Sequence, residues 1–413
     1  MIENIFNGLL DESEIEYNLV TDANNLYEGF LKSRSASKWK GSTQLFEINF
    51  LRRISRLQKR LINRTYRVSP GSSFILRERG KIRPIHAKTI DDRVVAHAFV
   101  DNVLNPIVKQ HIIYDNCASI KGRGIEMQRR RLEQHLHEYY RTYGINKGWV
   151  LLGDFTKFYD NIQHQKVYEL FERDLSDEYY LWLLKVFLKS FRVDVSYMDE
   201  DEYNRCMEEI YDRLTYWTFV APARRTGEKY MDKSIDIGDQ TSQAIGVYYP
   251  TRIDNYIKVV KGVRWYGRYM DDFYIISNSK EELEQILEVI IQIANEMGLF
   301  ISIRKTHITR IDRKFKFLQS HYWLTRSGAV VRKINKVRVH SMRVKVRKLG
   351  FMVQMNRREG TYIVNMIRSW IGAHGRYMSK LQYWGLKELI IDSFGEEIVN
   401  EFNLLFTINK QFK

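Results

Sequence analysis

The sequence has 413 residues, enough for two or three segments that share a connected hydrophobic core. Its 44% hydrophobic and 13% aromatic content is typical of a globular protein and excludes a disordered or low-complexity chain. The formal net charge of +16 indicates a polyanionic partner, because Lys and Arg gain affinity by releasing counterions from phosphates. The two cysteines, Cys117 and Cys206, exclude both a disulfide framework and a Cys-based zinc site.

The first segment, residues 1–73, is predicted to be a basic and mainly helical extension. Apolar residues recur at helical spacing in FEINFLRRISRLQKRLI, and seven basic residues but no acidic one lie between Leu51 and Arg67. A solvated helix face normally mixes both signs of charge, so we expect this stretch to form one wall of a groove for nucleic acid. The N-terminal residues have no basic start and no long apolar run, which predicts a cytoplasmic protein without a membrane span.

The central segment, residues 74–330, opens with a predicted hairpin. FILRERGKIRPI alternates in a strand-like way around a turn at Arg79 and Gly80. The following stretch, DDRVVAHAFVDNVLNPIV, is predicted to be a helix that an Asp caps.

A short apolar run, WVLLGDF at residues 149–155, predicts a buried strand, with a helix after it over about residues 164–191. Residues 192–235 are acidic at first and then mixed, without a clear period, and we interpret them as an insertion. VRWYGRYMDDFYIIS has two β-prone halves around a polar centre, which predicts a second hairpin with its acids at the turn.

The last segment, residues 331–413, is predicted to be basic and mostly helical. Ten basic residues stand against one acid, Glu359, between Val331 and Gly360. The order of predicted elements indicates an α+β fold, in which a small antiparallel sheet is backed by helices.

Three carboxylates lie inside the most apolar segments, where an unpaired charge is expensive. Asp154 ends the run WVLLGD, and Asp271 and Asp272 interrupt RYMDDFYII. Clustered carboxylates suit Mg²⁺, and two such ions can support an in-line phosphoryl displacement. The alternative is that Asp154 caps a helix and that the Asp pair only shapes a turn.

These segments resemble motifs of bacterial reverse transcriptases, including those of group II introns, diversity-generating retroelements and defence systems. LLGDFTKFYDNI resembles motif A, YMDD resembles motif C, IGDQTSQ is similar to motif B, and GLFISIRKTHI resembles motif D. KIRPIHAKTIDDRVVAH looks like the fingers segment, FLQSHYWLT the primer grip, and SWIGAHGRYMSK part of a thumb. The resemblance implies a right-hand polymerase with fingers, palm and helical thumb that makes cDNA as an RNA-directed DNA polymerase.

The same resemblance implies a role for each matching residue. Two Mg²⁺ ions, for which Mn²⁺ can substitute, would be held by Asp154, Phe155, Asp271 and Asp272. Lys305 would protonate or stabilise the leaving pyrophosphate. Nucleotide binding would fall to Lys81, Arg83, Tyr159, Ile237, Gly238, Ser242 and Gln243. Nucleic-acid backbone contacts would come from Arg52, Arg56, Arg60, Arg332, Lys336, Arg343 and Arg347.

Motif B departs from the common family pattern at one position. Ile237 stands before Gly238 where many reverse transcriptases have Gln, which puts ordinary fidelity in doubt. Tyr159 is expected to exclude a ribose 2′-hydroxyl and so to favour deoxynucleotides.

The expected partners are an RNA template, a DNA or RNA primer and deoxynucleoside triphosphates. A cognate noncoding RNA as template and an accessory protein bound at residues 1–73 or 192–235 are further hypotheses. The alternatives are an anti-phage enzyme that copies its noncoding RNA or works without a template, an RNA-dependent RNA polymerase, and a non-catalytic RNA-binding scaffold.

Overall fold

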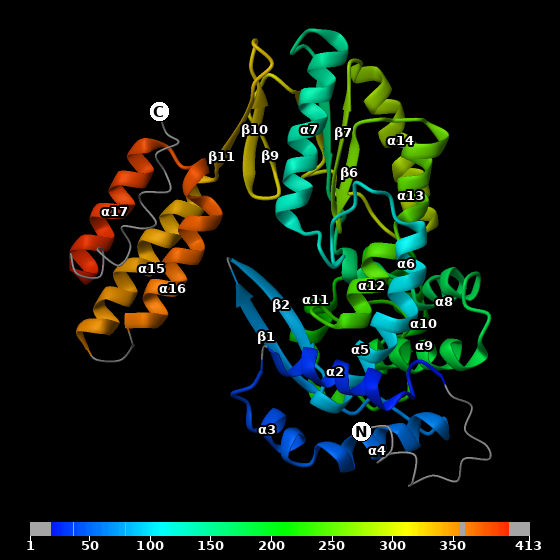
Figure 1. The fold of residues 1–413 in the computed structure, drawn as a ribbon. Coiled ribbons are helices and arrows are strands. Elements are labelled where there is room, and N and C mark those ends of the chain that lie inside the picture. The colour runs from blue at the N-terminus through cyan, green and yellow to red at the C-terminus, as the bar shows by residue number, and fades with distance from the viewer. Residues whose placement is uncertain (1–17, 36, 79, 356–359, 396–413) are drawn as a thin grey trace. The chain divides into compact units, whose positions relative to one another are not determined.

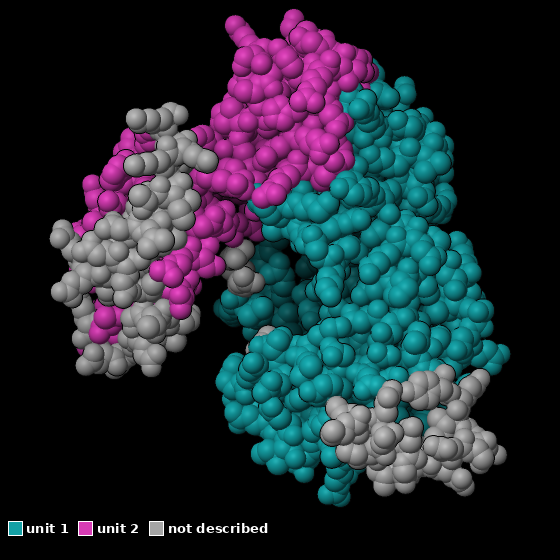
Figure 2. Space-filling view, in the orientation of Figure 1, with its two compact units in different colours: residues 1–128, 151–275, 281–307 teal, residues 129–150, 276–280, 308–413 magenta. Residues whose placement is uncertain are grey.

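The computed structural model describes residues 18–35, 37–78, 80–355 and 360–395, so Arg79 and Glu359 lie outside the described residues. The chain forms two compact units (Figure 2). Unit 1 contains residues 1–128, 151–275 and 281–307, and unit 2 contains residues 129–150, 276–280 and 308–413. The segment borders at residues 73 and 330 stay predictions.

The N-terminal part of unit 1 is helical, as predicted. Its helices are α2 (Ala23–Ser35), α3 (Gly41–Ile48) and α4 (Phe50–Ile62), and α2 packs against α5 (Ile90–Phe99) (Figure 1). The apolar spacing is interrupted at Asn49, where α3 ends and α4 begins. Helix α4 buries Ile54, Leu57 and Leu61 and leaves its basic residues on the other face.

The predicted basic hairpin is confirmed. Strand β1 (Ser72–Glu78) pairs antiparallel with β2 (Lys81–Ala87), with Phe74 opposite Ile85. The prediction that an Asp caps the next helix is wrong, because the N-cap of α5 is Thr89. The Thr89 side chain accepts from the Asp92 backbone N–H, and its hydroxyl donates to the Asp92 carboxylate at 2.6 Å.

The helix predicted over residues 164–191 is two helices. Helix α8 (His164–Glu172) ends before α9 (Glu178–Phe191), and Asp177 caps α9 by accepting from the Tyr179 backbone N–H at 2.7 Å. The apolar periodicity predicted a single helix because both helices bury apolar side chains. Upstream, α5 continues through a π-helical turn, η2 (Val100–Leu104), into α6 (Asn105–His111).

The segment predicted as an insertion has a small core of its own, made by Val195, Met198, Cys206, Tyr211 and Met231. Its elements are β4 (Val193–Asp194), α10 (Glu200–Glu208), α11 (Arg213–Phe219), η4 (Pro222–Arg224) and β5 (Tyr230–Met231). Asn161 lies in the 3-10 turn η3 (Phe158–Asn161). Its side chain accepts from the Tyr211 backbone N–H at 2.9 Å and donates to the Tyr211 carbonyl at 3.1 Å.

The buried strand and the acid-bearing hairpin are both confirmed. A four-stranded sheet has the order β6 (Tyr266–Tyr269), β7 (Asp272–Ser277), β3 (Trp149–Gly153) and β8 (His307–Arg310). Strands β6 and β7 are antiparallel, with Tyr269 opposite Asp272. Helices α12 (Gln240–Tyr248), α13 (Thr251–Asn255) and η5 (Tyr256–Val260) precede β6 in the sequence, and α14 (Lys280–Glu296) follows β7.

Unit 2 combines helix α7 (Ile125–Tyr143), which begins in unit 1, with a small sheet and three C-terminal helices. The sheet has the order β11 (Val330–Ile334), β10 (Ser320–Leu324) and β9 (Phe315–Phe317). Helices α15 (Lys336–Gln354), α16 (Gly360–His374) and α17 (Lys380–Phe394) share one apolar core, with the short turn η6 (Gly375–Tyr377) between the last two. Among the described residues, no helix is long and apolar enough to cross a membrane.

Candidate active site

Asp154 is placed by the strand that precedes it. It follows β3 directly, and its backbone carbonyl accepts from the Ser302 N–H at 2.8 Å. The next residue, Phe155, forms an antiparallel bridge with Ile301 and is only 2% exposed. The Asp154 side chain is 15% exposed, so its carboxylate lies at the margin of the core.

Asp271 and Asp272 lie at the turn between β6 and β7. Met270 has a φ of 55°, a left-handed conformation that residues with a side chain seldom adopt. This conformation makes the turn tight and brings Asp272 to the first position of β7, with both acids partly buried.

Gly153 lets the segments that carry these acids approach closely. A Cβ atom at Gly153 would lie 2.0 Å from the ring of Phe273, the residue after Asp272. No side chain fits at that distance, so Gly153 allows Asp154 to lie near the β6–β7 turn.

The three carboxylates repel one another. Burial first, and then the charge of Asp154, raises the pKa of Asp271. Burial and the charges of Asp271 and Asp154 raise the pKa of Asp272 to about 7. Lys305 and Lys81 partly offset both shifts. The cluster therefore holds more negative charge than these two lysines neutralise, which fits a site for added cations.

Lys305 contacts one of the three acids directly. Its ammonium lies 2.6 Å from Asp154 Oδ1, and its side chain is 56% exposed. In the described part of the chain, no three His, Cys, Asp or Glu side chains are grouped as a ready metal site. The acids are thus brought near one another without forming a complete protein cage.

Tyr159 lies beside the same turn. Its hydroxyl is 3.8 Å from the Met270 sulfur and 3.4 Å from the position of a Cβ atom on Gly246 in α12. Burial, and secondarily the charge of Asp271, raises the pKa of the Tyr159 hydroxyl, so this group stays protonated at neutral pH.

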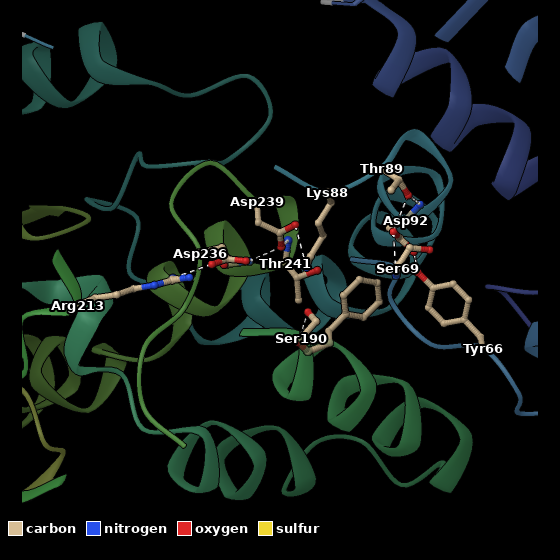
Figure 3. A network of polar contacts seen from close by, with 12 residues as sticks. Tyr66, Ser69, Lys88, Thr89, Asp92, Ser190, Arg213, Asp236, Asp239 and Thr241 are labelled. Carbon is tan, nitrogen blue, oxygen red and sulfur yellow. Dashed lines mark hydrogen bonds and ion pairs between the residues drawn. The ribbon is translucent and has the colours of Figure 1, made fainter. Parts of the chain in front are cut away.

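The loop before α12 is held by two buried ion pairs. Asp236 pairs with Arg213 at 2.7 Å, and Asp239 pairs with Lys88 at 3.1 Å (Figure 3). Asp239 also caps α12 by accepting from the backbone N–H groups of Thr241 and Ser242, at 2.9 and 3.2 Å. Figure 3 shows Lys88 reaching Asp239 from the side of the Asp92 cluster, in which Asp92 accepts from Tyr66 and Ser69.

Sequence reasoning missed both Lys88 and Asp239. An Asp immediately before a helix is an N-cap signal, so Asp239 could have been found. Lys88 gave no signal, because its partner is far away in the sequence.

Among the predicted motif B residues, Gly238 is exposed, Ile237 and Gln243 are half-buried and Ser242 is buried. Gly238 is exposed with a φ of 88°, and a Cβ atom added to it would meet no other atom within 4 Å, while Ile237 is half-buried. Ser242 is 0% exposed, and Gln243 accepts a hydrogen bond from the Ser119 hydroxyl. Ile237 and Gly238 can therefore meet a ligand directly, whereas Ser242 is part of the core.

Lys81 and Arg83 project from strand β2. They are two residues apart and so share one face of the hairpin. Lys81 is exposed and its charge lowers the pKa values of Asp271 and Asp272, whereas Arg83 is half-buried opposite Leu76. The structure thus brings Lys81 within electrostatic reach of the acids.

The basic residues predicted to contact nucleic acid differ in exposure. On α4, Arg52 and Arg56 are exposed, whereas Arg60 is half-buried and donates to the Arg67 carbonyl at 3.1 Å. On α15, Lys336 and Arg347 are exposed.

Two further residues predicted to contact nucleic acid, Arg332 and Arg343, lie in unit 2. Arg332 is 7% exposed, pairs with Glu133 at 3.1 Å and donates to the Tyr377 hydroxyl at 2.8 Å. The Arg343 guanidinium occupies the space that a side chain on Gly385 would need. Arg332 is therefore not a free basic surface group, whereas Arg343 stays half-buried.

The sequence matches the family described as reverse transcriptase (RNA-dependent DNA polymerase) over residues 71–322. It is also similar to Protein YkfC of Escherichia coli (strain K12), with 22% identity over 277 residues, which is 63% of this chain and 69% of that protein. The family match spans the whole candidate site from Lys81 to Lys305.

Proposed function

The chain belongs to the reverse transcriptase family, and we propose that it is an RNA-directed DNA polymerase with fingers, palm and thumb. The observation that carries this proposal is the electrostatic repulsion among Asp154, Asp271 and Asp272, with Lys81 and Lys305 within electrostatic reach. In this assignment the β1–β2 hairpin belongs to the fingers, the four-stranded sheet to the palm and helices α15–α17 to the thumb.

The excess of carboxylate charge suits Mg²⁺, or Mn²⁺ in its place. Asp154, Asp271 and Asp272 would hold the ions together with the Phe155 carbonyl and the substrate phosphates, since Mg²⁺ is commonly bound by a few carboxylates and substrate oxygens. When bound, such ions lower the pKa of the attacking hydroxyl and neutralise charge on the leaving group.

The reaction joins the primer 3′-oxygen to the α-phosphorus of a deoxynucleoside triphosphate and breaks the bond to pyrophosphate. Lys81 and Arg83, on one face of β2, would neutralise the triphosphate. Lys305 would donate a proton to the leaving pyrophosphate. Tyr159, held against Met270 and α12, would exclude a ribose 2′-hydroxyl, and Ile237 and Gly238 would lie against the nascent base pair.

Phosphate contacts would come from the exposed basic residues. Arg52 and Arg56 on α4, and Lys336 and Arg347 on α15, present charges that can bind a nucleic-acid backbone without selecting sequence. A noncoding RNA is a suitable template, in a retroelement or in antiviral defence. Both settings use the same chemistry, so an activity assay would not distinguish them. Sequencing the RNA that copurifies from the native host would.

Primer extension on a defined RNA template with Mg²⁺ and four deoxynucleotides tests the proposal. The key variant is Asp271→Asn with Asp272→Asn, and we expect it to lose at least about 10³-fold in rate because both acids face the reacting groups. The matched control is Glu208→Gln with Glu209→Gln, which replaces two consecutive, exposed carboxylates with amides.

We expect the control to extend the primer like the wild type. Equal extension by the Asp271/Asp272 variant would contradict the proposed site. Incorporation of ribonucleotides in preference to deoxynucleotides would instead indicate an RNA polymerase.

A further inference from the structure

Arg268 is a fully buried cation close to the candidate active site. It lies in β6, two residues before Met270, and both its side chain and that of Asp254 in α13 are 0% exposed. Its Nε and Nη2 atoms donate to the two carboxylate oxygens of Asp254, at 2.8 and 2.6 Å. The Tyr266 hydroxyl donates to the same carboxylate at 2.5 Å.

This arrangement keeps the Arg268 guanidinium charged. Burial alone would lower the pKa of the Arg268 guanidinium, but Asp254 raises it above its ordinary value. Burial and the Asp254 charge raise the pKa of the Tyr266 hydroxyl. Arg268 is therefore a permanent cation with a planar set of donors in fixed directions.

The other donors of Arg268 reach two backbone carbonyls. Nη1 donates to Met270 O at 3.1 Å, and Nη2 donates to Val247 O at 2.9 Å, near the end of α12. The backbone N–H of Arg268 donates to Asp115 O at 3.2 Å. One side chain thus joins the β6–β7 turn to α12 and α13.

The bond to Met270 O bears on the acids directly. That oxygen belongs to the peptide unit that joins Met270 to Asp271, and a peptide unit is planar. Holding its oxygen restricts the orientation of the Asp271 N–H, which follows the left-handed residue Met270. Asp272 follows Asp271 directly, as the first residue of β7.

We propose that Arg268 is a positioning residue, which orients the Met270–Asp271 peptide and so sets where Asp271 and Asp272 point. The inference rests on the proposed function, in which these acids hold metal ions. Groups that orient metal ligands typically alter metal affinity or activity by about 10–100-fold when they are replaced.

The test compares Arg268→Lys with Arg192→Lys in the full-length protein. Lysine keeps the charge beside Asp254, but its single ammonium group cannot donate to Asp254, Met270 O and Val247 O together. The control residue, Arg192, also donates two N–H groups to one carboxylate, that of Asp232, but its side chain is 35% exposed. Mn²⁺ binding is measured by electron paramagnetic resonance, alongside thermal unfolding and single-nucleotide extension.

We expect Arg268→Lys to bind Mn²⁺ about 10-fold more weakly. Its kcat should fall by about 10–100-fold, with the KM for deoxynucleotide changed by less than about 2-fold. Arg192→Lys should match the wild type in all three measurements. A purely structural role for Arg268 would lower the unfolding temperature and leave Mn²⁺ binding and kcat unchanged, and this result would overturn the proposal.

If Arg268→Lys does not fold, Tyr266→Phe provides the test, because it removes one hydrogen bond to Asp254 and keeps the ion pair. We expect about 3-fold weaker Mn²⁺ binding from this variant, and unchanged binding would overturn the proposal. Weaker Mn²⁺ binding in Arg268→Lys, in a protein that makes no DNA, would reject the proposed function but retain the role of Arg268. DNA synthesis by the wild type, together with normal Mn²⁺ binding in Arg268→Lys, would support the proposed function and reject the role of Arg268.

Discussion

Helix α12 has a buried ion pair near each end, and the two pairs are built differently. At its start, Lys88 lies 3.1 Å from Asp239, and its ammonium also lies 4.2 and 4.8 Å from the ring centres of Phe191 and Phe187. Near its end, Arg268 donates to both oxygens of Asp254 and to two backbone carbonyls.

The difference indicates two kinds of contribution. An ammonium is a compact charge, so Lys88 mainly neutralises Asp239, whose directed hydrogen bonds come from the helix backbone. A guanidinium fixes the directions of its acceptors, so Arg268 also determines geometry. The first pair should matter chiefly for stability, and the second for stability and for the position of the β6–β7 turn.

The largest effect is expected from Arg268→Met. This change leaves the Asp254 carboxylate buried without its cation, and we expect a loss of about 3–5 kcal/mol in the free energy of unfolding, measured by urea titration. The double variant Arg268→Met with Asp254→Leu removes both charges and should recover most of that loss. A single-variant loss below about 1 kcal/mol would contradict this account of the pair.

A smaller effect is expected from Lys88→Met. The thioether can replace the ammonium over the Phe187 and Phe191 rings, and Asp239 keeps its two backbone donors. We expect a loss of about 2 kcal/mol in the same urea titration, with Mn²⁺ affinity unchanged. A loss greater than that of Arg268→Met, or weakened Mn²⁺ binding, would show that the two ends of α12 do not differ as proposed.

The smallest effect is expected at Asp160, a half-buried acid whose neighbouring cations pair with other acids. Lys157 pairs with Asp212 and Arg213 pairs with Asp236, while burial raises the pKa of Asp160 to about 6. A raised folded-state pKa means that ionised Asp160 opposes folding above pH 6, and that this cost declines as the pH falls toward the unfolded-state value near 4.

Replacing this acid with Asn should therefore stabilise the protein more at high pH. We expect Asp160→Asn to gain about 1 kcal/mol more at pH 8 than at pH 5, from urea titrations at both values. A gain independent of pH would contradict a raised pKa for Asp160 in the folded protein.

Local sequence patterns mark only some parts of the candidate site. Asp154 after an apolar run and the Asp pair inside a β-prone hairpin were found because charges are unusual there. The β1–β2 hairpin followed from alternation around a glycine turn. The break between α8 and α9 was missed, since apolar spacing continues across it.

Long-range partners could not be predicted in this way. Arg268 looked like one more basic residue, and only the fold shows that it lies against Asp254 with no exposure. Arg332 was predicted to bind nucleic acid because basic residues cluster around it, yet it is buried against Glu133 and Tyr377. Charge clusters in a sequence do not show which members face the core.

The most direct test of the central claim is to sequence the product made on an RNA template of mixed sequence with Mg²⁺ and all four deoxynucleotides. We predict DNA complementary to that template from the wild type and from the Glu208/Glu209 control, and none from the Asp271/Asp272 variant. A product whose sequence is independent of the template, or one made equally by the Asp271/Asp272 variant, would contradict the claim.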